Sequence, residues 1–481
     1  MTRHIETVSL DLDTLLGDPH DPANRFRAPE LLAADERREI VYGAEEMLDG
    51  MGFAAELIPV AAGGAFEGFD RLLDRMRPLS RFDVALTVAQ VVEPGASAAA
   101  VFALGTSEQR RRVAESLSAR GRFTTAFGDG SDPAYGNGIR VRSGSGVLDG
   151  TVTLVIDADR AREVLVFAED AAGGVSAHLV DGYRHPGSVV PVCHRTLGLH
   201  GCRVGELRFD HCAVGTDDAL TPGPDALRIA RRVRRLLSVA AALGPVDAAL
   251  FEVLGFAADR HLYGGRVLDL PHARATLAQA YADLQLAELI SRGTAHLLDT
   301  APEIGGTHAA AAAVVVPRLL EDAVRELSVV LGARFYLRTG RYALFGKHFR
   351  DLLALSICRG SESSCAADVP EDISTVRVPD GLARYIGRAA YADLSRADPG
   401  EPRTTALGRY VIRALPVEVA DRYLTTLPAW WPLARHRLLN RSGAPAPREA
   451  IEAAFADLLD RARECRAFDL AARSLPRQPV D

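Results

Sequence analysis

The sequence contains few of the residues that mark several classes of protein. Its six cysteines are spread over 481 residues without a CxxC pair, which excludes a disulfide framework and the usual zinc motifs. Lys347 is the only lysine, and the formal net charge is −7, so a basic surface for nucleic acid is not expected. The one tempting His/Cys cluster also matches no zinc spacing; it comprises Cys193, His194, His200, Cys202, His211 and Cys212. These absences predict a reducing compartment, no bound metal and no nucleic-acid partner.

Long uncharged apolar runs are missing as well. No stretch approaches eighteen apolar residues without a charge, and residues 1–19 carry acids where a signal peptide has bases ahead of an apolar run. Trp430 and Trp431 lie in a stretch without a sustained basic amphipathic face, which favours helix docking over membrane contact. We therefore expect a soluble, cytoplasmic protein that does not contact a membrane.

What is present predicts an α+β fold that is mainly α. Residues 29–120 place apolar residues three and four apart, and Thr106 or Ser107 ahead of Glu108 and Gln109 is a helix-capping signature. Residues 123–210 read instead as short strands separated by Gly, Asp and Pro, which is typical of an antiparallel meander or barrel. Long helices follow from Ala226, and we expect Pro317 to kink or break the third of them. The predicted domains are an N-terminal helical domain (1–120), a middle antiparallel β domain (121–222), a C-terminal helical bundle (223–368) and a helical C-terminal extension (369–481).

Two features of this layout suit a nucleotide cofactor. The turn GDGSD at residues 128–132 lets the backbone approach a ligand closely, although a plain Gly/Asp turn has the same composition. Arg260 follows a long helix, where a guanidinium can bind a diphosphate or can simply face solvent.

Strings in a fixed order carry a family resemblance. They are ALGTSEQRRRVAESLSARG, TAFGDGSD, LDGTVTLVIDADRAREVLVFAED, TLGLHGCRVGELRFDHCAV, ADRHLYGG and RDLLALSICRGSES. Over residues 79–367 they resemble the acyl-CoA dehydrogenase superfamily of flavoproteins. The resemblance implies FAD as cofactor, with contacts at Thr125, Gly130, Ser131, Arg260, Tyr263 and Gly332. It also implies an acyl thioester substrate, carried by coenzyme A or a carrier protein, and a homodimer or homotetramer in which Arg260 reaches a neighbouring subunit's cofactor.

The departures from that pattern concern the catalytic base. Removal of the α-proton of an acyl thioester requires a carboxylate, which the resemblance places at residue 359 or residue 234. Both positions are arginine here, and arginine cannot accept a proton. Glu362 lies one helical turn after Arg359 and is the remaining candidate, with a surface glutamate as the alternative. We expect Arg234 and Arg359 to make the pocket positive, suited to stabilising an anion and poor at ordinary dehydrogenation.

Three functions stay open at this point. The first is a flavoenzyme that acts on an acyl thioester with a non-standard active site, in a specialised biosynthetic pathway. The second is a flavin-dependent monooxygenase on the same fold. The third is a non-catalytic subunit of a hetero-oligomeric dehydrogenase. The first is favoured because this scaffold most often carries it.

Overall fold

The structure is a computed structural model that describes residues 11–127, 142–144, 146–182, 194–370, 403–424, 428–439, 445–477 and 480. The chain divides into two compact units. The first comprises residues 1–79, 85–196 and 200–234, and the second comprises residues 80–84, 197–199 and 235–481. The strands and the helices that precede them fall mostly in the first unit. The long helices from residue 235 onward form the second.

The N-terminal part of the chain is helical. Its helices are α1 (Leu12–Leu16), α2 (Ala28–Arg37), α3 (Ala44–Gly50), α4 (Phe69–Phe82), α5 (Val84–Thr87), α6 (Glu93–Leu104) and α7 (Ser107–Ser118). One π-helical turn, Val88–Val92, comes directly before α6. The Thr106 hydroxyl accepts a hydrogen bond from the Gln109 amide, and the Gln109 side chain accepts one from the Thr106 amide. This capping box confirms the predicted start of α7.

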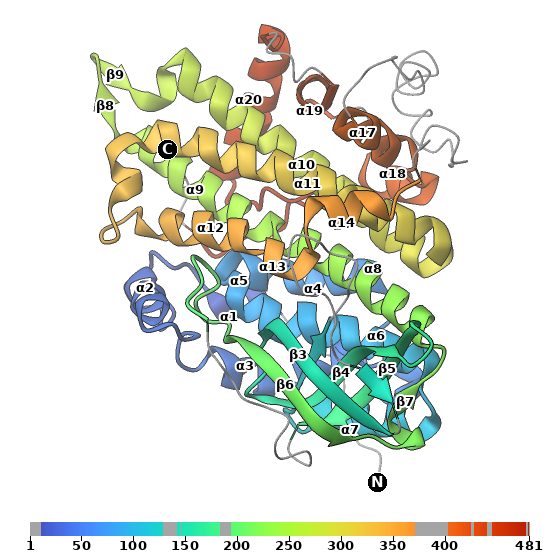
Figure 1. Cartoon of the computed structure of the whole chain (residues 1–481). Helices are drawn as coiled ribbons and strands as arrows, with labels where there is room; N and C mark the ends of the chain where they lie inside the picture. The colour runs from blue at the N-terminus through green and yellow to red at the C-terminus, as the bar shows by residue number, and fades with distance from the viewer. Residues whose placement is uncertain are drawn as a thin grey trace. The chain divides into compact units, whose positions relative to one another are not determined.

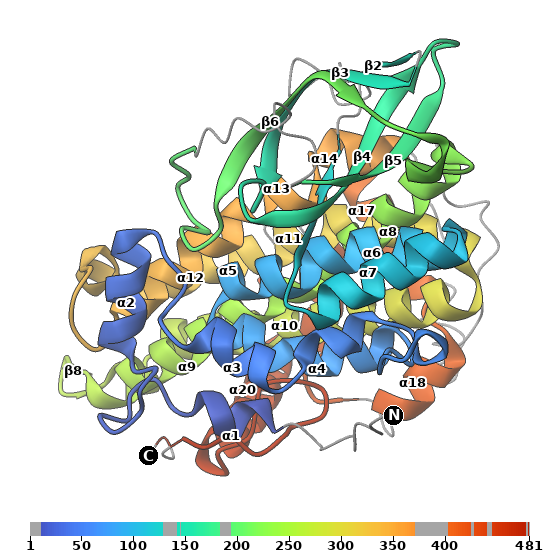
Figure 2. The ribbon, with the colours of Figure 1, turned by 90° about the horizontal axis from the view of Figure 1, so that it is seen from below.

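A seven-stranded sheet follows, with the strand order β6-β3-β2-β4-β5-β7 and β1 paired with β4. The strands are β1 (Arg122–Ala126), β2 (Arg142–Gly144), β3 (Val147–Ile156), β4 (Ala161–Asp170), β5 (Val175–Asp181), β6 (Val204–Ala213) and β7 (Ala219–Leu220). Most pairs are antiparallel as expected, but β1 and β2 both run parallel to β4. Alternating hydrophobicity marks a strand but carries no information on its direction, so the fully antiparallel prediction is wrong for these two pairs. Helices α6 and α7 lie beside each other (Figure 2), and both contact β1.

Long helices build the bundle of the second unit. They are α9 (Leu243–Asp259), α10 (Pro271–Thr300), α11 (Pro302–Leu331) and α12 (Ala343–Ala354), followed by the short α13 (Ser356–Arg359) and α14 (Glu362–Ala367). Helix α8 (Gly223–Ala241) begins in the first unit, which ends at Arg234, and continues into the second. Helices α9 to α12 lie side by side (Figure 1). Helix α11 continues through Pro317, so of the predicted kink or break the break is absent. The Pro317 side chain is buried, and packing of α11 against α9 and α10 outweighs the cost of about 3 kcal/mol for an interior proline.

The C-terminal helices cover α10 and α11. They are α17 (Arg403–Arg413), α18 (Val417–Tyr423), α19 (Trp431–Leu439) and α20 (Arg448–Arg463). Trp430 and Trp431 are buried, as a docking anchor would be. The α+β, mainly α fold class predicted from the sequence is confirmed.

Two segments are long and apolar enough to cross a membrane by length and composition. They are Val84–Leu104 and Gly223–Asp259, and 89% and 94% of their most apolar windows are buried inside the protein. Helices at the core of a globular protein have the same composition.

Candidate functional site

Arg234 lies in a buried ion pair in the first unit. From α8 its Nε and Nη2 donate hydrogen bonds of 2.9 and 2.7 Å to Oε1 of Glu93, the first residue of α6. The Glu93 side chain is buried, and the Phe127 ring lies against the guanidinium with its centroid 4.7 Å from Cζ. Phe127 stacks in turn on Phe167 of β4. Arg234 is therefore fixed along one edge by a carboxylate and on one face by an aromatic ring.

Thr125 lies close to this pair. It is the fourth residue of β1, its side chain is buried, and its hydroxyl shares a hydrogen bond with Ser97 of α6. Ser97 is one helical turn after Glu93, so the two side chains share a face of α6. Gly130 and Ser131, the other predicted contacts of this turn, lie outside the described residues. The part that is described thus places one predicted cofactor contact beside the Glu93–Arg234 pair.

Arg260, Tyr263 and Gly332 gather at one end of the second unit. Arg260 ends α9, and Tyr263 and Gly264 form the two-residue turn of the hairpin β8 (His261–Leu262) and β9 (Gly265–Arg266). Gly332 ends α11 with φ 56° and ψ −131°, in open space. The chain that follows Gly332 returns to the end of α9, where Asp259 accepts hydrogen bonds from the side chains of Arg341 and Tyr342.

The chemistry of this end suits part of a dinucleotide. Arg260 is exposed, and no described carboxylate pairs with it, so its guanidinium can bind a diphosphate. Tyr263 is 89% exposed and presents a ring for stacking. Gly332 allows close approach, although its positive φ is already explained by its role as the cap of α11. The predicted contacts therefore fit the phosphate and ring chemistry of FAD.

Arg359 and Glu362 are not placed as expected. Arg359 ends α13 and its Nη2 lies 3.4 Å from Oε1 of Glu321 on α11. Gly360, with φ 84°, ends that helix, and Ser361 caps a new one that begins at Glu362. The two residues therefore do not lie one turn apart on a single helix. Glu362 is about half exposed and accepts a hydrogen bond of 2.8 Å from Arg318. The expectation that Glu362 faces a cavity beside Arg359 is not supported.

The prediction of a doubly positive pocket also needs correction. Each of the two arginines lies against a carboxylate: Glu93 binds Arg234, and Glu321, which also pairs with Arg325, binds Arg359. Neither position carries an uncompensated charge. The sequence could not show this, because both partners are distant along the chain.

The only lysine is a buried part of the second unit. Lys347 of α12 is 3% exposed, and its Nζ lies 2.6 Å from Oδ2 of Asp351 and 3.1 Å from Oδ1 of Asp83. Oδ1 of Asp351 accepts a hydrogen bond of 2.6 Å from the amide of Leu199. This network fastens the segments 80–84 and 197–199 to α12, which is a structural role.

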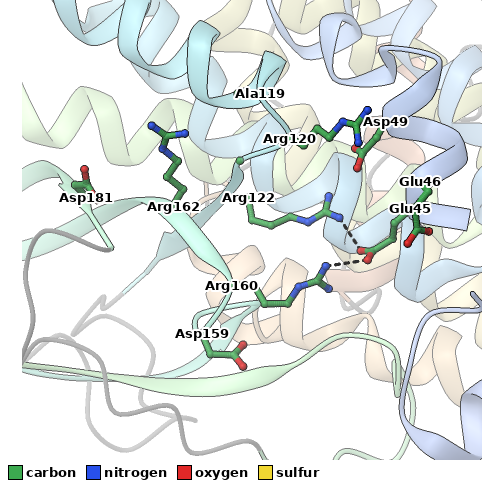
Figure 3. Close-up of a pocket in the computed structure, with 11 residues that line it drawn as sticks. Glu45, Glu46, Asp49, Ala119, Arg120, Arg122, Asp159, Arg160, Arg162 and Asp181 are labelled. Atoms are coloured by element: carbon green, nitrogen blue, oxygen red, sulfur yellow. Dashed lines mark hydrogen bonds and ion pairs between the residues drawn. The ribbon is translucent and has the colours of Figure 1, made fainter. Parts of the chain in front are cut away.

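A charged pocket of about 850 Å³ opens in the first unit (Figure 3). It is lined by Glu45, Glu46, Asp49, Ala119, Arg120, Gly121, Arg122, Asp159, Arg160, Arg162 and Asp181. Its four arginines face five carboxylates, and Glu45 binds both Arg122 and Arg160 at 2.8 Å. The pocket lies at the start of β1, about 16 Å along the strand from Phe127 at 3.3 Å per residue. Five carboxylates against four arginines give the pocket a formal charge of −1, and none of the described cofactor contacts predicted from the sequence lines it.

One group of described residues has the ligand spacing of a metal site. Asp149, Asp210 and His211 place their ligand atoms within 4.8 Å of one another at the surface. The hydrogen bond from His211 to Asp149 raises the pKa of that imidazole, which favours the protonated form that cannot bind a metal. This group therefore carries no metal assignment.

Glu93 is the residue of this site that sequence reasoning missed. The sequence does contain a signal for Glu93, because it is the only charged residue between Asp83 and Glu108. A single charge in so long an apolar segment indicates a buried and paired side chain.

Comparison with known proteins finds similarity to acyl-CoA dehydrogenases. Residues 230–370 match the family model described as acyl-CoA dehydrogenase, C-terminal domain. The chain is 24% identical over 345 residues to a glutaryl-CoA dehydrogenase of Desulfococcus multivorans. The aligned region covers 68% of this chain and 87% of that protein. The structure of butyryl-CoA dehydrogenase from Megasphaera elsdenii has a TM-score of 0.64 at 17% identity, covering 74% of this chain and 95% of that one. The structure of a prolyl acyl carrier protein oxidase has a TM-score of 0.65 at 17% identity, and the match covers 70% of this chain and 92% of that one. These two solved structures share the fold of this chain.

Proposed function

Because the chain belongs to the acyl-CoA dehydrogenase superfamily, we propose that it is an FAD-dependent enzyme acting on an acyl thioester through a non-standard active site. The thioester is carried by coenzyme A or by a carrier protein. One relative named above acts on a CoA thioester and one structural neighbour on an acyl carrier protein, so both carriers are candidates. A role in a specialised biosynthetic pathway is part of this proposal.

The observation that carries the cofactor proposal is the exposed group at the end of α9. Arg260 would bind the diphosphate of FAD, Tyr263 would lie against its rings, and Gly332 would allow close approach of the backbone. In the first unit, Thr125 lies at the strand end that leads into the predicted flavin turn. The chemistry that FAD supplies when bound is acceptance of a hydride from the thioester.

The same end of the second unit supports an oligomer. Tyr263, Leu262, Tyr336 and Leu337 are 89%, 38%, 80% and 46% exposed. A second copy of the chain, or a related subunit, would remove this apolar surface from water. A homodimer or homotetramer, or alternatively a hetero-oligomer, is therefore part of the proposal. Five free cysteines among the described residues suit the proposed cytoplasmic location.

A visible spectrum of the purified protein tests this function directly. We expect flavin absorbance that is released on denaturation, and we expect Arg260→Ala to weaken FAD binding at least tenfold. Arg266→Ala is the matched control, because Arg266 lies in the same hairpin but pairs with Asp269 at 3.4 Å. Acetyl-, butyryl- and glutaryl-CoA, and the corresponding acyl carrier proteins, would then be tested for binding and for anaerobic bleaching of the flavin. A colourless protein that takes up no added FAD would contradict the proposal.

A further inference from the structure

Glu93 is costly to bury, and its burial is not explained by stability alone. Burying a carboxylate costs several kcal/mol even after relaxation, and an ion pair in the interior recovers little more than that. Apolar residues of similar volume at both positions would serve packing equally well. Helix α6 is otherwise apolar around Glu93, with Pro94, Gly95, Ala96 and Ala98 all buried.

The position of Glu93 is specific. Its carboxylate lies against Arg234, the residue that stands where the family resemblance places a catalytic glutamate. The two residues are 141 apart in the sequence. Helix α6 therefore places a carboxylate beside the α8 position at which the resemblance expects one.

The surroundings of Glu93 connect it to the predicted cofactor contacts. Ser97, one turn further along α6, shares a hydrogen bond with Thr125 on β1. The π-helical turn Val88–Val92 ends directly before Glu93, and such turns are frequent at functional sites. Of the other buried glutamates in this unit, Glu163 pairs with Arg112 at 3.1 Å. Its partner Arg112 comes from α7, and the resemblance assigns no role to either residue.

We propose that Glu93 is the proton acceptor of this enzyme, with Arg234 stabilising the anion that forms. This inference rests on the proposed function, since it requires an acyl thioester in the site. The α C–H bond of the thioester breaks, the proton moves to the Glu93 carboxylate, and the electron pair is delocalised onto the thioester oxygen as an enolate. Return of the proton reverses the step, so the exchange of the α-proton needs no oxidant.

The pairing with arginine suits this step. The Arg234 guanidinium lies 2.7 Å from the Glu93 carboxylate, so in the proposed step it would stabilise the negative charge that develops beside that carboxylate. A positioned carboxylate of this kind contributes about 10²–10⁴-fold to proton transfer. Loss of Glu93 alone should therefore have a large effect on exchange and a small one on cofactor binding.

The test is exchange of the thioester α-protons in D₂O, followed by mass spectrometry with acetyl-, butyryl- and glutaryl-CoA. It compares wild type, Glu93→Gln and the control Glu163→Gln, which alters a buried glutamate–arginine pair of the same unit. Flavin absorbance and thermal unfolding are measured in parallel. We expect Glu93→Gln to lower exchange at least 100-fold while it still binds flavin, and Glu163→Gln to exchange as the wild type does.

A charge-swapped double variant covers the case in which Glu93→Gln does not fold. Glu93→Arg with Arg234→Glu keeps the ion pair and moves the carboxylate to α8, so we expect exchange at least tenfold above the background without protein. A folded swap variant without exchange, or Glu93→Gln with wild-type exchange, would overturn the inference. The inference would also be wrong if the wild type binds flavin and thioester but does not exchange the thioester α-protons. Absence of both flavin and thioester binding in the wild type would instead count against the proposed function.

Discussion

Arg437 of α19 closes an ion pair with Asp283, a carboxylate in the middle of α10 that is completely buried. Nε and Nη2 of Arg437 lie 3.1 and 2.8 Å from Oδ2 of Asp283, and Nη1 binds Glu326 at 3.1 Å. Tyr281 and Gln285 of α10 likewise bond to residues of the extension, Asp457 and the carbonyl of Phe468. The C-terminal extension therefore binds three buried polar side chains of α10 and is an integral part of the second unit.

Replacement of Arg437 by Met should destabilise the second unit strongly at neutral pH. The substitution leaves the buried Asp283 carboxylate without its cation, which costs about 3–5 kcal/mol. The loss should be smaller at pH 5, because a protonated Asp283 needs no cation. Urea unfolding of both proteins at pH 7 and pH 5 measures the difference.

The control for that experiment is Arg274→Ala. Arg274 also joins α10 to the extension, through Glu452 at 2.5 Å, but both side chains are substantially exposed. An exposed pair contributes less than about 1 kcal/mol. Equal losses for the two variants would show that burial of Asp283 is not the cause.

The pH dependence of stability should carry a component from Asp283. Burial raises the pKa of Asp283 to about 6, against the lowering effect of Arg437, from an ordinary value of 3.8. The folded state thus binds the proton more tightly than the unfolded state, so this contribution is complete below about pH 4 and is lost as pH rises through 6. Between those values the free energy of unfolding of the wild type should fall, relative to Asp283→Asn, by up to about 1.4 kcal/mol per pH unit. Parallel curves for the two proteins across pH 4.5–7 would contradict this assignment.

The sequence predicted the elements better than their pairing. Periodicity and the Thr106 capping signature located α7, because caps and amphipathic faces are local properties of the chain. The direction of β1 against β4 depends on the path of a long connection, which has no local signal. Pro317 failed as a helix breaker because tertiary packing outweighed its local cost.

In the candidate site, too, the sequence did not show which distant residues meet. The family resemblance identified Arg234 and Arg359 as the residues at the usual base positions. Their partners Glu93 and Glu321 come from other helices, so only the folded chain reveals that both charges are compensated. The glutamate expected from proximity in sequence, Glu362, begins a separate helix and pairs with Arg318.

Arg359→Glu should not restore a dehydrogenase. The new carboxylate would face Glu321, which now lies 3.4 Å from the Arg359 guanidinium, and like charges there should lower stability by about 1–3 kcal/mol. The double variant Arg359→Glu with Glu321→Arg should recover only part of that stability, because Glu321 also pairs with Arg325 at 3.1 Å. Thermal unfolding and an assay with acyl-CoA and an artificial electron acceptor measure both effects. A clear rise in turnover for Arg359→Glu alone would place the base at this position after all.

Lys347 should be protected from amine-reactive reagents until the protein unfolds. It is the only lysine, it is 3% exposed, and both Asp351 and Asp83 hold its ammonium group. Acylation requires an amine that the reagent can reach, and burial of Lys347 between two carboxylates keeps the reagent out. We expect mass spectrometry to find Lys347 unmodified in the native protein under conditions that fully label a lysine-containing reference peptide in the same tube. In increasing urea, labelling should appear together with the loss of helical circular dichroism, because the contacts of α12 with segments 80–84 and 197–199 must open first. Rapid labelling of the native protein would show that this network opens independently of global unfolding.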